Sequence, residues 1–160
     1  MAPAFAATGD TLERQLRVLP NDLDINSHMN NGRYLTIIDL MLVEYFVRTG
    51  FACVMLRKGR RPMSGGAIIS YRQGLNSFQT HRLRFRLDAS DDHWNYMRFE
   101  FVREGRVHAA SYMKGAAVAR GRLAPNTKSY AAMNTSPLAK PLPAVQHWLA
   151  AEQGVMAVTW

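Results

Sequence analysis

Asp22, Asp24 and His28 lie within one short stretch, just before a long apolar segment. Carboxylate and imidazole groups are the side chains that proteins most often use as bases, nucleophiles or metal ligands. The full stretch, residues 21–34, reads NDLDINSHMNNGRY and also contains four asparagines. These residue types admit three interpretations: a metal-binding loop, a catalytic turn, or a turn that caps a helix.

The metal interpretation fails on spacing. The first half of the stretch places acidic and amide side chains as a calcium loop does. However, Ser27 stands where that loop needs glycine, and Arg33 stands where it needs glutamate. For zinc, His28 and Asp24 have no second histidine or cysteine nearby at ligand spacing. We therefore predict no metal at this loop.

A structural interpretation accounts for several of these polar residues. Aspartate and asparagine side chains accept hydrogen bonds from nearby backbone N–H groups in turns, and they cap helices. Asn30 or Asn31 can cap a helix that starts at this point of the chain. For Asp22, Asn26 and Asn30, formation of the turn is the favoured role.

Asp24 differs because it lies shortly before the start of a helix. The N-terminus of a helix leaves backbone N–H groups unpaired and carries a partial positive charge. If Asn31 begins the helix, its amide can polarise a carbonyl group as an oxyanion hole does. The carboxylate of Asp24, on the same turn, can then attack that carbonyl or activate a water molecule. This combination favours acyl transfer.

A helix must position these groups. From Asn31 to about Val47, apolar side chains recur at spacings of three and four, over enough of the surface to predict a helix buried on most sides. Gly50 marks its end. Residues 12–19 precede it as a predicted strand, and residues 57–66 come after it as a predicted basic loop.

After that loop the pattern indicates strands. Four apolar or alternating runs are separated by turn residues, at positions 67–71, 81–87, 94–102 and 107–118. In the second run, three arginines alternate with apolar side chains. We expect the arginines (Arg82, Arg84 and Arg86) to face solvent and the apolar residues (Leu83, Phe85 and Leu87) to face the helix.

The order of elements predicts an α+β fold, in which consecutive antiparallel strands form a meander covered on one face by the helix. We predict one domain over residues 1–122. Residues 123–160 are predicted to be an irregular C-terminal extension in which a short helix, residues 143–152, can form.

The pattern D-L-D-I-N-S-H-M-N-N-G-R-Y, with the helix and strands after it, resembles the hotdog-fold acyl-CoA thioesterases of the 4-hydroxybenzoyl-CoA thioesterase-like branch. The resemblance covers residues 12–119. It implies the hotdog fold, an antiparallel sheet wrapped around one long buried helix. It also implies that Asp24 is catalytic and that the Asn31 amide polarises the thioester carbonyl. His28, Asn30 and Tyr34 match the pattern and are assigned to substrate binding.

The resemblance also implies partners. It predicts an acyl-CoA or acyl-carrier-protein substrate, no cofactor, and a homodimer or homotetramer with sites between subunits. The chain carries 20 lysines and arginines against 12 acids, a net charge of +8, which suits polyanionic CoA and an acidic carrier protein alike. The same resemblance leaves one alternative open, a non-catalytic acyl-CoA-binding hotdog protein, because fold does not fix function.

Other partners are disfavoured. Nucleic acid is not expected, because the face with the three arginines carries no aromatic residue and no nucleic-acid-binding motif is present. No secretory signal is apparent, the longest apolar segment is too short to span a bilayer, and Cys53 is the only cysteine. We therefore expect a cytoplasmic protein that does not contact a membrane. The basic residues at 57–61 can meet CoA phosphates, but a solvated loop is favoured.

Overall fold

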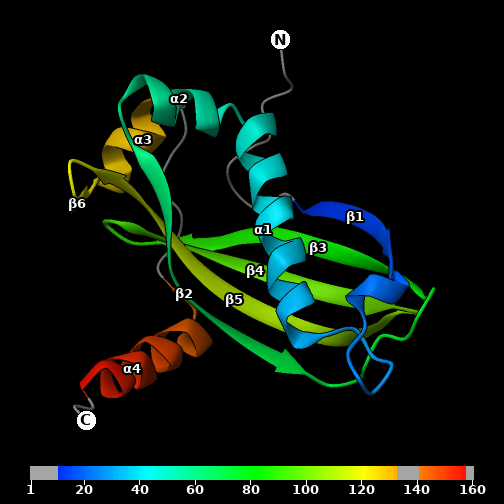
Figure 1. The fold of residues 1–160 in the computed structure, drawn as a ribbon. Coiled ribbons are helices and arrows are strands. Elements are labelled where there is room, and N and C mark those ends of the chain that lie inside the picture. The colour runs from blue at the N-terminus through cyan, green and yellow to red at the C-terminus, as the bar shows by residue number, and fades with distance from the viewer. Residues whose placement is uncertain (1–10, 133–140, 158–160) are drawn as a thin grey trace.

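One antiparallel sheet and one long helix form the centre of the molecule (Figure 1). The computed structural model describes residues 11–132 and 141–157. Its elements are β1 (Leu12–Arg17), the 3-10 helix η1 (Pro20–Asp22), α1 (Asn31–Arg48), α2 (Phe51–Arg57), β2 (Arg61–Tyr71), β3 (Thr80–Ser90), β4 (Trp94–Arg103), β5 (Arg106–Ala119), β6 (Arg122–Leu123), α3 (Asn126–Ala132) and α4 (Pro143–Ala157). Within the described ranges, no helix combines the length and the apolar character needed to cross a bilayer.

The strand order of the sheet is β1-β3-β4-β5-β2, and every neighbouring pair is antiparallel. The short β6 adds to β5. The predicted α+β fold is confirmed, and so is the predicted meander for β3, β4 and β5. The prediction that β2 precedes β3 in the same meander is wrong, because β2 pairs with β5 at the far edge of the sheet.

Helix α1 lies across one face of this sheet (Figure 1). It begins at Asn31 as predicted, and Asn30 caps it by accepting a hydrogen bond of 2.8 Å from the Gly32 amide. Its buried residues are Tyr34, Ile38, Met41 and Leu42. They share one core with inward-facing side chains of the sheet, among them Leu83, Phe85, Phe99 and Phe101. Each large apolar side chain buried in this way contributes about 1.5–3 kcal/mol.

Two predictions about α1 and its neighbourhood are wrong. Leu40, Val43 and Val47 are 58–66% exposed, so the helix is not buried on most sides within one chain. The predicted basic loop is also shorter than expected, because α2 ends at Arg57 and β2 already begins at Arg61. Residues 61–66 form a strand because their backbone pairs with β5. Their glycine- and arginine-rich sequence does not indicate this pairing.

The glycines of β2 serve packing rather than a turn. A Cβ atom added to Gly65 would lie 2.2 Å from the ring of Trp94. A bulge occurs at this point of β2, between Ser64 and Gly66. A side chain here would displace the tryptophan, so the glycine permits the close approach of the Trp94 ring.

The C-terminal extension contains two helices. Part of the segment predicted to be irregular forms α3, the predicted terminal helix lies within α4, and residues 133–140 lie outside the described ranges. Helix α4 packs on the sheet face opposite α1, where Val145 contacts Ala89 and Tyr96. An ion pair between Lys114 and Glu152 also joins α4 to β5. The division of the chain at residue 122 stays a prediction.

Candidate functional site

Asp24 lies in a tight loop between η1 and α1, and backbone amides fix its carboxylate. Its Oδ1 accepts hydrogen bonds from the amides of Asn26, at 2.8 Å, and His28, at 3.4 Å. The Asp24 amide donates to the carbonyl of His28 at 2.8 Å, which closes the loop. No described residue donates to Oδ2, so that oxygen can face a ligand.

The start of α1 presents an unpaired amide. The Gly32 and Arg33 amides donate to the side chain and the carbonyl of Asn30, at 2.8 and 2.9 Å. The amide of Asn31 has no intrahelical acceptor, and no described residue accepts a hydrogen bond from it. Asn31 is exposed, so a carbonyl oxygen brought to the end of the helix can accept this hydrogen bond.

The carboxylate of Asp22 is buried and is bound by groups of the same loop and helix. Asp22 is only 4% exposed, and its Oδ1 pairs with the Arg33 guanidinium at 2.7 Å. Its Oδ2 accepts a hydrogen bond of 2.8 Å from the Leu19 amide. Both carboxylate oxygens are therefore occupied within the chain, in agreement with the turn-forming role expected from the sequence.

Tyr34 lies one turn into α1 and is only 2% exposed. Its ring meets the rings of Tyr71 and Phe101 edge-on, with centroids 5.1 and 4.8 Å apart. Burial raises the pKa of the Tyr34 hydroxyl, and the nearby charge of Asp24 adds to that rise. The phenol therefore stays neutral, and its ring belongs to the core beneath the Asp24 loop.

His28 is exposed and rests against the loop that precedes β3. A Cβ atom added to Gly74 would lie 2.7 Å from Cδ2 of the imidazole ring, so only glycine allows this approach. The backbone of His28 also forms an antiparallel bridge with Asn76. The structure thus gathers Asp24, His28, Asn30 and Asn31 at one end of α1. Their assigned roles, and that of Tyr34, stay predictions.

Sequence analysis missed Tyr71, which comes from the end of β2. Its hydroxyl donates to the carbonyl oxygen of Asn31 at 3.2 Å. A tyrosine in a short apolar run carries no sequence signal for this contact, because the contact depends on where β2 pairs.

A cavity of about 260 Å³ lies along the other half of α1. Asp24 and Asn31 are not among its lining residues, but Asp39 is. Asp39 lies eight positions after Asn31, which corresponds to about 12 Å along the helix. Asp39 is exposed at this cavity, and no described residue forms an ion pair or hydrogen bond with it. The sequence signal for Asp39 was an acid within an otherwise apolar helix. Asp39 was not included among the candidate residues of the sequence analysis.

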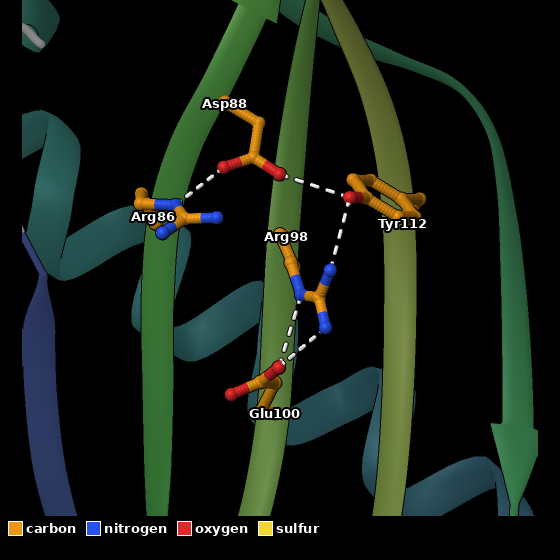
Figure 2. Close-up of polar contacts among 5 residues, drawn as sticks. All are labelled: Arg86, Asp88, Arg98, Glu100 and Tyr112. Atoms are coloured by element: carbon orange, nitrogen blue, oxygen red, sulfur yellow. Dashed lines mark hydrogen bonds and ion pairs between the residues drawn. The ribbon is translucent and has the colours of Figure 1, made fainter. Parts of the chain in front are cut away.

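The opposite face of the sheet carries the arginines, as predicted from their alternation. Arg82 and Arg84 pair with Glu13 of β1. Figure 2 shows that Arg86 joins a polar network: Asp88 pairs with Arg86 and accepts a hydrogen bond of 2.9 Å from the Tyr112 hydroxyl. Arg98 contacts Glu100 at 2.6 Å and Tyr112 at 3.2 Å. These guanidinium groups therefore have carboxylate or hydroxyl partners within the chain.

Known proteins resemble this chain in sequence and in fold. The family model of the thioesterase-like superfamily matches residues 18–149. Protein THEM6 of Xenopus laevis is 39% identical over 85 residues, which cover 53% of this chain and 41% of that protein, less than half of its length.

Solved structures share the fold. A probable thioesterase from Escherichia coli has a TM-score of 0.70 at 16% identity, with 76% of this chain and 97% of that chain covered. A hypothetical protein from Staphylococcus aureus, solved in complex with CoA, has a TM-score of 0.69 at 12% identity, with 85% and 92% covered. At identities this low, the similarity shows only that the fold is shared.

Proposed function

The chain belongs to the thioesterase-like superfamily, and from this premise we propose that it hydrolyses the thioester of an acyl group with CoA or a carrier protein. One observation carries the proposal: the carboxylate of Asp24 is fixed by backbone amides on the loop that leads into α1, where the Asn31 amide has no acceptor among the described residues. A fixed carboxylate and an unpaired helix-end amide are the groups that attack on a carbonyl requires.

The reaction uses both groups on one carbonyl. The thioester oxygen accepts a hydrogen bond from the Asn31 amide, which stabilises the negative charge that develops on it. Asp24 either attacks the carbonyl carbon or removes a proton from the attacking water. If Asp24 acts as the base, the water oxygen forms the new C–O bond, the C–S bond breaks, the sulfur takes up the proton and leaves as a thiol, and the acyl group leaves as a carboxylic acid. If Asp24 attacks, the C–S bond breaks to give the thiol and an anhydride between the acyl group and Asp24, which water then hydrolyses to the carboxylic acid and free Asp24.

CoA is the favoured carrier of the acyl group. The structural relative from Staphylococcus aureus was solved in complex with CoA, which supports the same ligand here. The net charge of +8 also favours a ligand with several phosphates over a neutral one.

We further propose that two copies of the chain form the site. Among the described strands, β2 is an edge that pairs only with β5, and an unpaired edge can add another strand. Exposed apolar side chains of β2 and α1 accompany this edge, and such surfaces mark contacts between proteins. They are Leu40, Val43, Val47, Met63, Ile68 and Tyr71.

We place β2 of one chain antiparallel to β2 of a second copy, with the two-fold axis at Ala67. Met63 of one chain would then lie opposite Tyr71 of the other, because Ala67 is halfway between them. Met63 lines the cavity, and Tyr71 contacts the helix start at Asn31. This dimer would therefore bring Asp24 and the helix end of one chain to the cavity of its partner.

The experiment compares three substitutions that remove one negative charge at nearly equal shape. Wild type, Asp24→Asn, Asp39→Asn and Asp92→Asn are assayed against a panel of acyl-CoA thioesters, with folding checked by thermal melting. Asp24→Asn should lose about 10²- to 10⁴-fold in kcat, the usual contribution of a general base, or more. Asp92, exposed in the β3–β4 turn, is the matched control and should keep wild-type turnover.

Each other outcome has a definite meaning. If Asp39→Asn loses turnover and Asp24→Asn keeps it, the catalytic carboxylate is Asp39 and our assignment is wrong. If wild type binds acyl-CoA but turns over no member of the panel, the non-catalytic acyl-CoA-binding alternative replaces the thioesterase.

A further inference from the structure

The cavity along α1 has an open mouth and a closed end. Its mouth is formed by exposed residues of α1 and β2, namely Asp39, Val43, Pro62, Met63 and Ser64. Its inner end is formed by buried residues of β4, β5 and α3, including Met97, Met113, Ala116, Asn126, Ser129 and Tyr130. A molecule that enters between α1 and β2 would therefore advance toward α3.

The walls are apolar and adaptable. Leu42, Phe46 and Phe51 line the helical side of the cavity. Met63, Met97 and Met113 line the strand side. Methionine is flexible and fills irregular gaps, so such walls fit an unbranched chain as well as a ring.

At the inner end, the side-chain donors of Tyr130, Asn95 and Asn126 are used within the chain. The Tyr130 hydroxyl donates to Oδ1 of Asn95 at 2.6 Å, and Nδ2 of Asn95 donates to Asn126 and to the Gly115 carbonyl. Nδ2 of Asn126 donates to the carbonyls of Asp91 and Trp94, at 2.9 and 3.1 Å.

Helix α3 is fixed in this position. Arg60, which was predicted to lie in a solvated basic loop, donates to the Ser129 hydroxyl at 2.8 Å. The Asn126 amide also donates to the carbonyl of Asp92 at 2.8 Å. Two hydrogen bonds therefore hold α3, and with it the end of the cavity, against Arg60 and the β3–β4 turn.

We propose that this cavity holds the acyl group, that the group is an apolar chain of medium length, and that Tyr130 of α3 sets the length at which binding stops. The inference rests on the proposed function for the identity of the ligand. An engineered apolar cavity of about 150 Å³ binds benzene, so about 260 Å³ corresponds to roughly ten carbon atoms.

The same arrangement excludes polar acyl groups. A hydroxyl or carboxylate at the end of the chain would lose its water and find the side-chain N–H and O–H donors of Asn95, Asn126 and Tyr130 already in use, a loss of about tenfold in affinity.

The test measures binding separately from hydrolysis. Calorimetry gives the affinity of the full chain for saturated fatty acids of increasing length, and the acyl-CoA panel gives kcat/KM for the same lengths. In wild type, affinity should rise about fourfold per methylene and stop rising near ten carbons. In Tyr130→Ala, the rise should continue for at least two more carbons, a gain of roughly 15-fold for the longer acid.

A second variant moves the limit in the other direction and does not depend on α3. A Cβ atom at Gly115 would lie 2.9 Å from Cε of Met97, whose flexible end would move into the cavity. Gly115→Ala should therefore shorten the preferred chain. Tyr112→Phe, on the opposite face of the sheet, is the matched control and should keep the wild-type length preference.

The outcomes separate this inference from the proposed function. If fatty-acid binding follows the predicted lengths while no thioester is hydrolysed, the cavity assignment holds and the thioesterase proposal fails. If thioesters are hydrolysed but the length preference is unchanged in both Tyr130→Ala and Gly115→Ala, the cavity assignment fails and the thioesterase proposal holds. Absence of any length preference in wild type also overturns the cavity assignment.

Discussion

The hydroxyl of Tyr71 donates a hydrogen bond of 3.2 Å to the carbonyl oxygen of Asn31. This contact joins the end of β2 to the first turn of α1, and the Tyr71 ring also packs edge-on against Tyr34. The helix end with the unpaired amide is therefore held in place by the strand edge at which we expect a second copy to bind.

Removal of this hydroxyl should loosen the helix end without disturbing the ring packing. Because one hydrogen bond contributes about 0.5–1.5 kcal/mol, Tyr71→Phe should lower kcat by up to about tenfold and leave KM nearly unchanged. Hydrogen exchange at the amides of Gly32 and Arg33, which are hydrogen-bonded to Asn30, should quicken when measured by NMR. Tyr112→Phe, which removes a hydroxyl on the other face of the sheet, is the control. Unchanged exchange together with unchanged kcat would mean that Tyr71 does not position the helix end.

A positive charge at the centre of the β2 edge should prevent dimer formation. Ile68 is exposed beside the expected two-fold axis, so Ile68→Lys would bring two like charges together in the dimer. Sedimentation should show a monomer at micromolar concentration, and turnover should fall by about 10²-fold or more because the reacting groups separate. Met156→Lys, an equivalent change at an exposed site of α4, should keep both dimer and turnover. A fully active monomer would show that one chain holds a complete site.

Asp22 and Asp24 should affect different properties although both are acids of one loop. Asp22→Asn weakens the pair with Arg33 and should lower the free energy of unfolding by about 1–3 kcal/mol, less than for a fully buried pair, because Arg33 is partly exposed. Asp24→Asn should leave stability nearly unchanged, since the amide oxygen can still accept the loop hydrogen bonds. Urea denaturation measures both. Equal losses of stability in the two variants would contradict this division.

Arg33 provides a check on the Asp22 result. If the ion pair accounts for the loss, Arg33→Met should destabilise the protein to a similar extent. The free energy of unfolding of the double variant should then be no lower than that of the less stable single variant, because the two residues share one interaction. Additive losses would mean that the two side chains act separately.

His81 should make the protein sensitive to acid. The ring is 2% exposed, and neither of its nitrogens has a hydrogen-bond partner among the described residues. Burial, together with the neighbouring His108, lowers the pKa of His81 to about 4, and Asp22 opposes this only weakly. The unfolded chain binds the proton near pH 6.5, so the folded state loses up to about 3 kcal/mol as the pH falls from 6.5 to 4. Above pH 6.5 the neutral ring carries no such cost.

Replacing the imidazole separates this effect from the titration of acids. His81→Phe keeps a ring beside Phe101 and removes two buried polar atoms without partners. The variant should be as stable as wild type or more stable at pH 7, and its stability should fall less steeply between pH 6.5 and 4. Urea midpoints across this range measure the slope. A slope equal to that of wild type would show that His81 does not carry the acid sensitivity.

Local patterns in the sequence determined the start of α1, the alternating faces of β3 and the position of the candidate site. Asn30 caps and Asn31 begins the helix because side-chain oxygens satisfy unpaired amides within a few residues of themselves. The arginines of β3 face solvent because strand side chains alternate. These interactions reach only a few residues along the chain, so the residue order alone reveals them.

Contacts between segments far apart in the chain required the tertiary structure. The pairing of β2 with β5 decided that Tyr71 meets Asn31, that Asp39 lies at a cavity mouth, and that a sequence expected to be a loop is a strand. The closed end of that cavity depends on α3, which lies in a segment that appeared irregular in sequence. Such contacts arise from the packing of whole elements, whose free energy is shared among many residues and leaves no local pattern in any one of them.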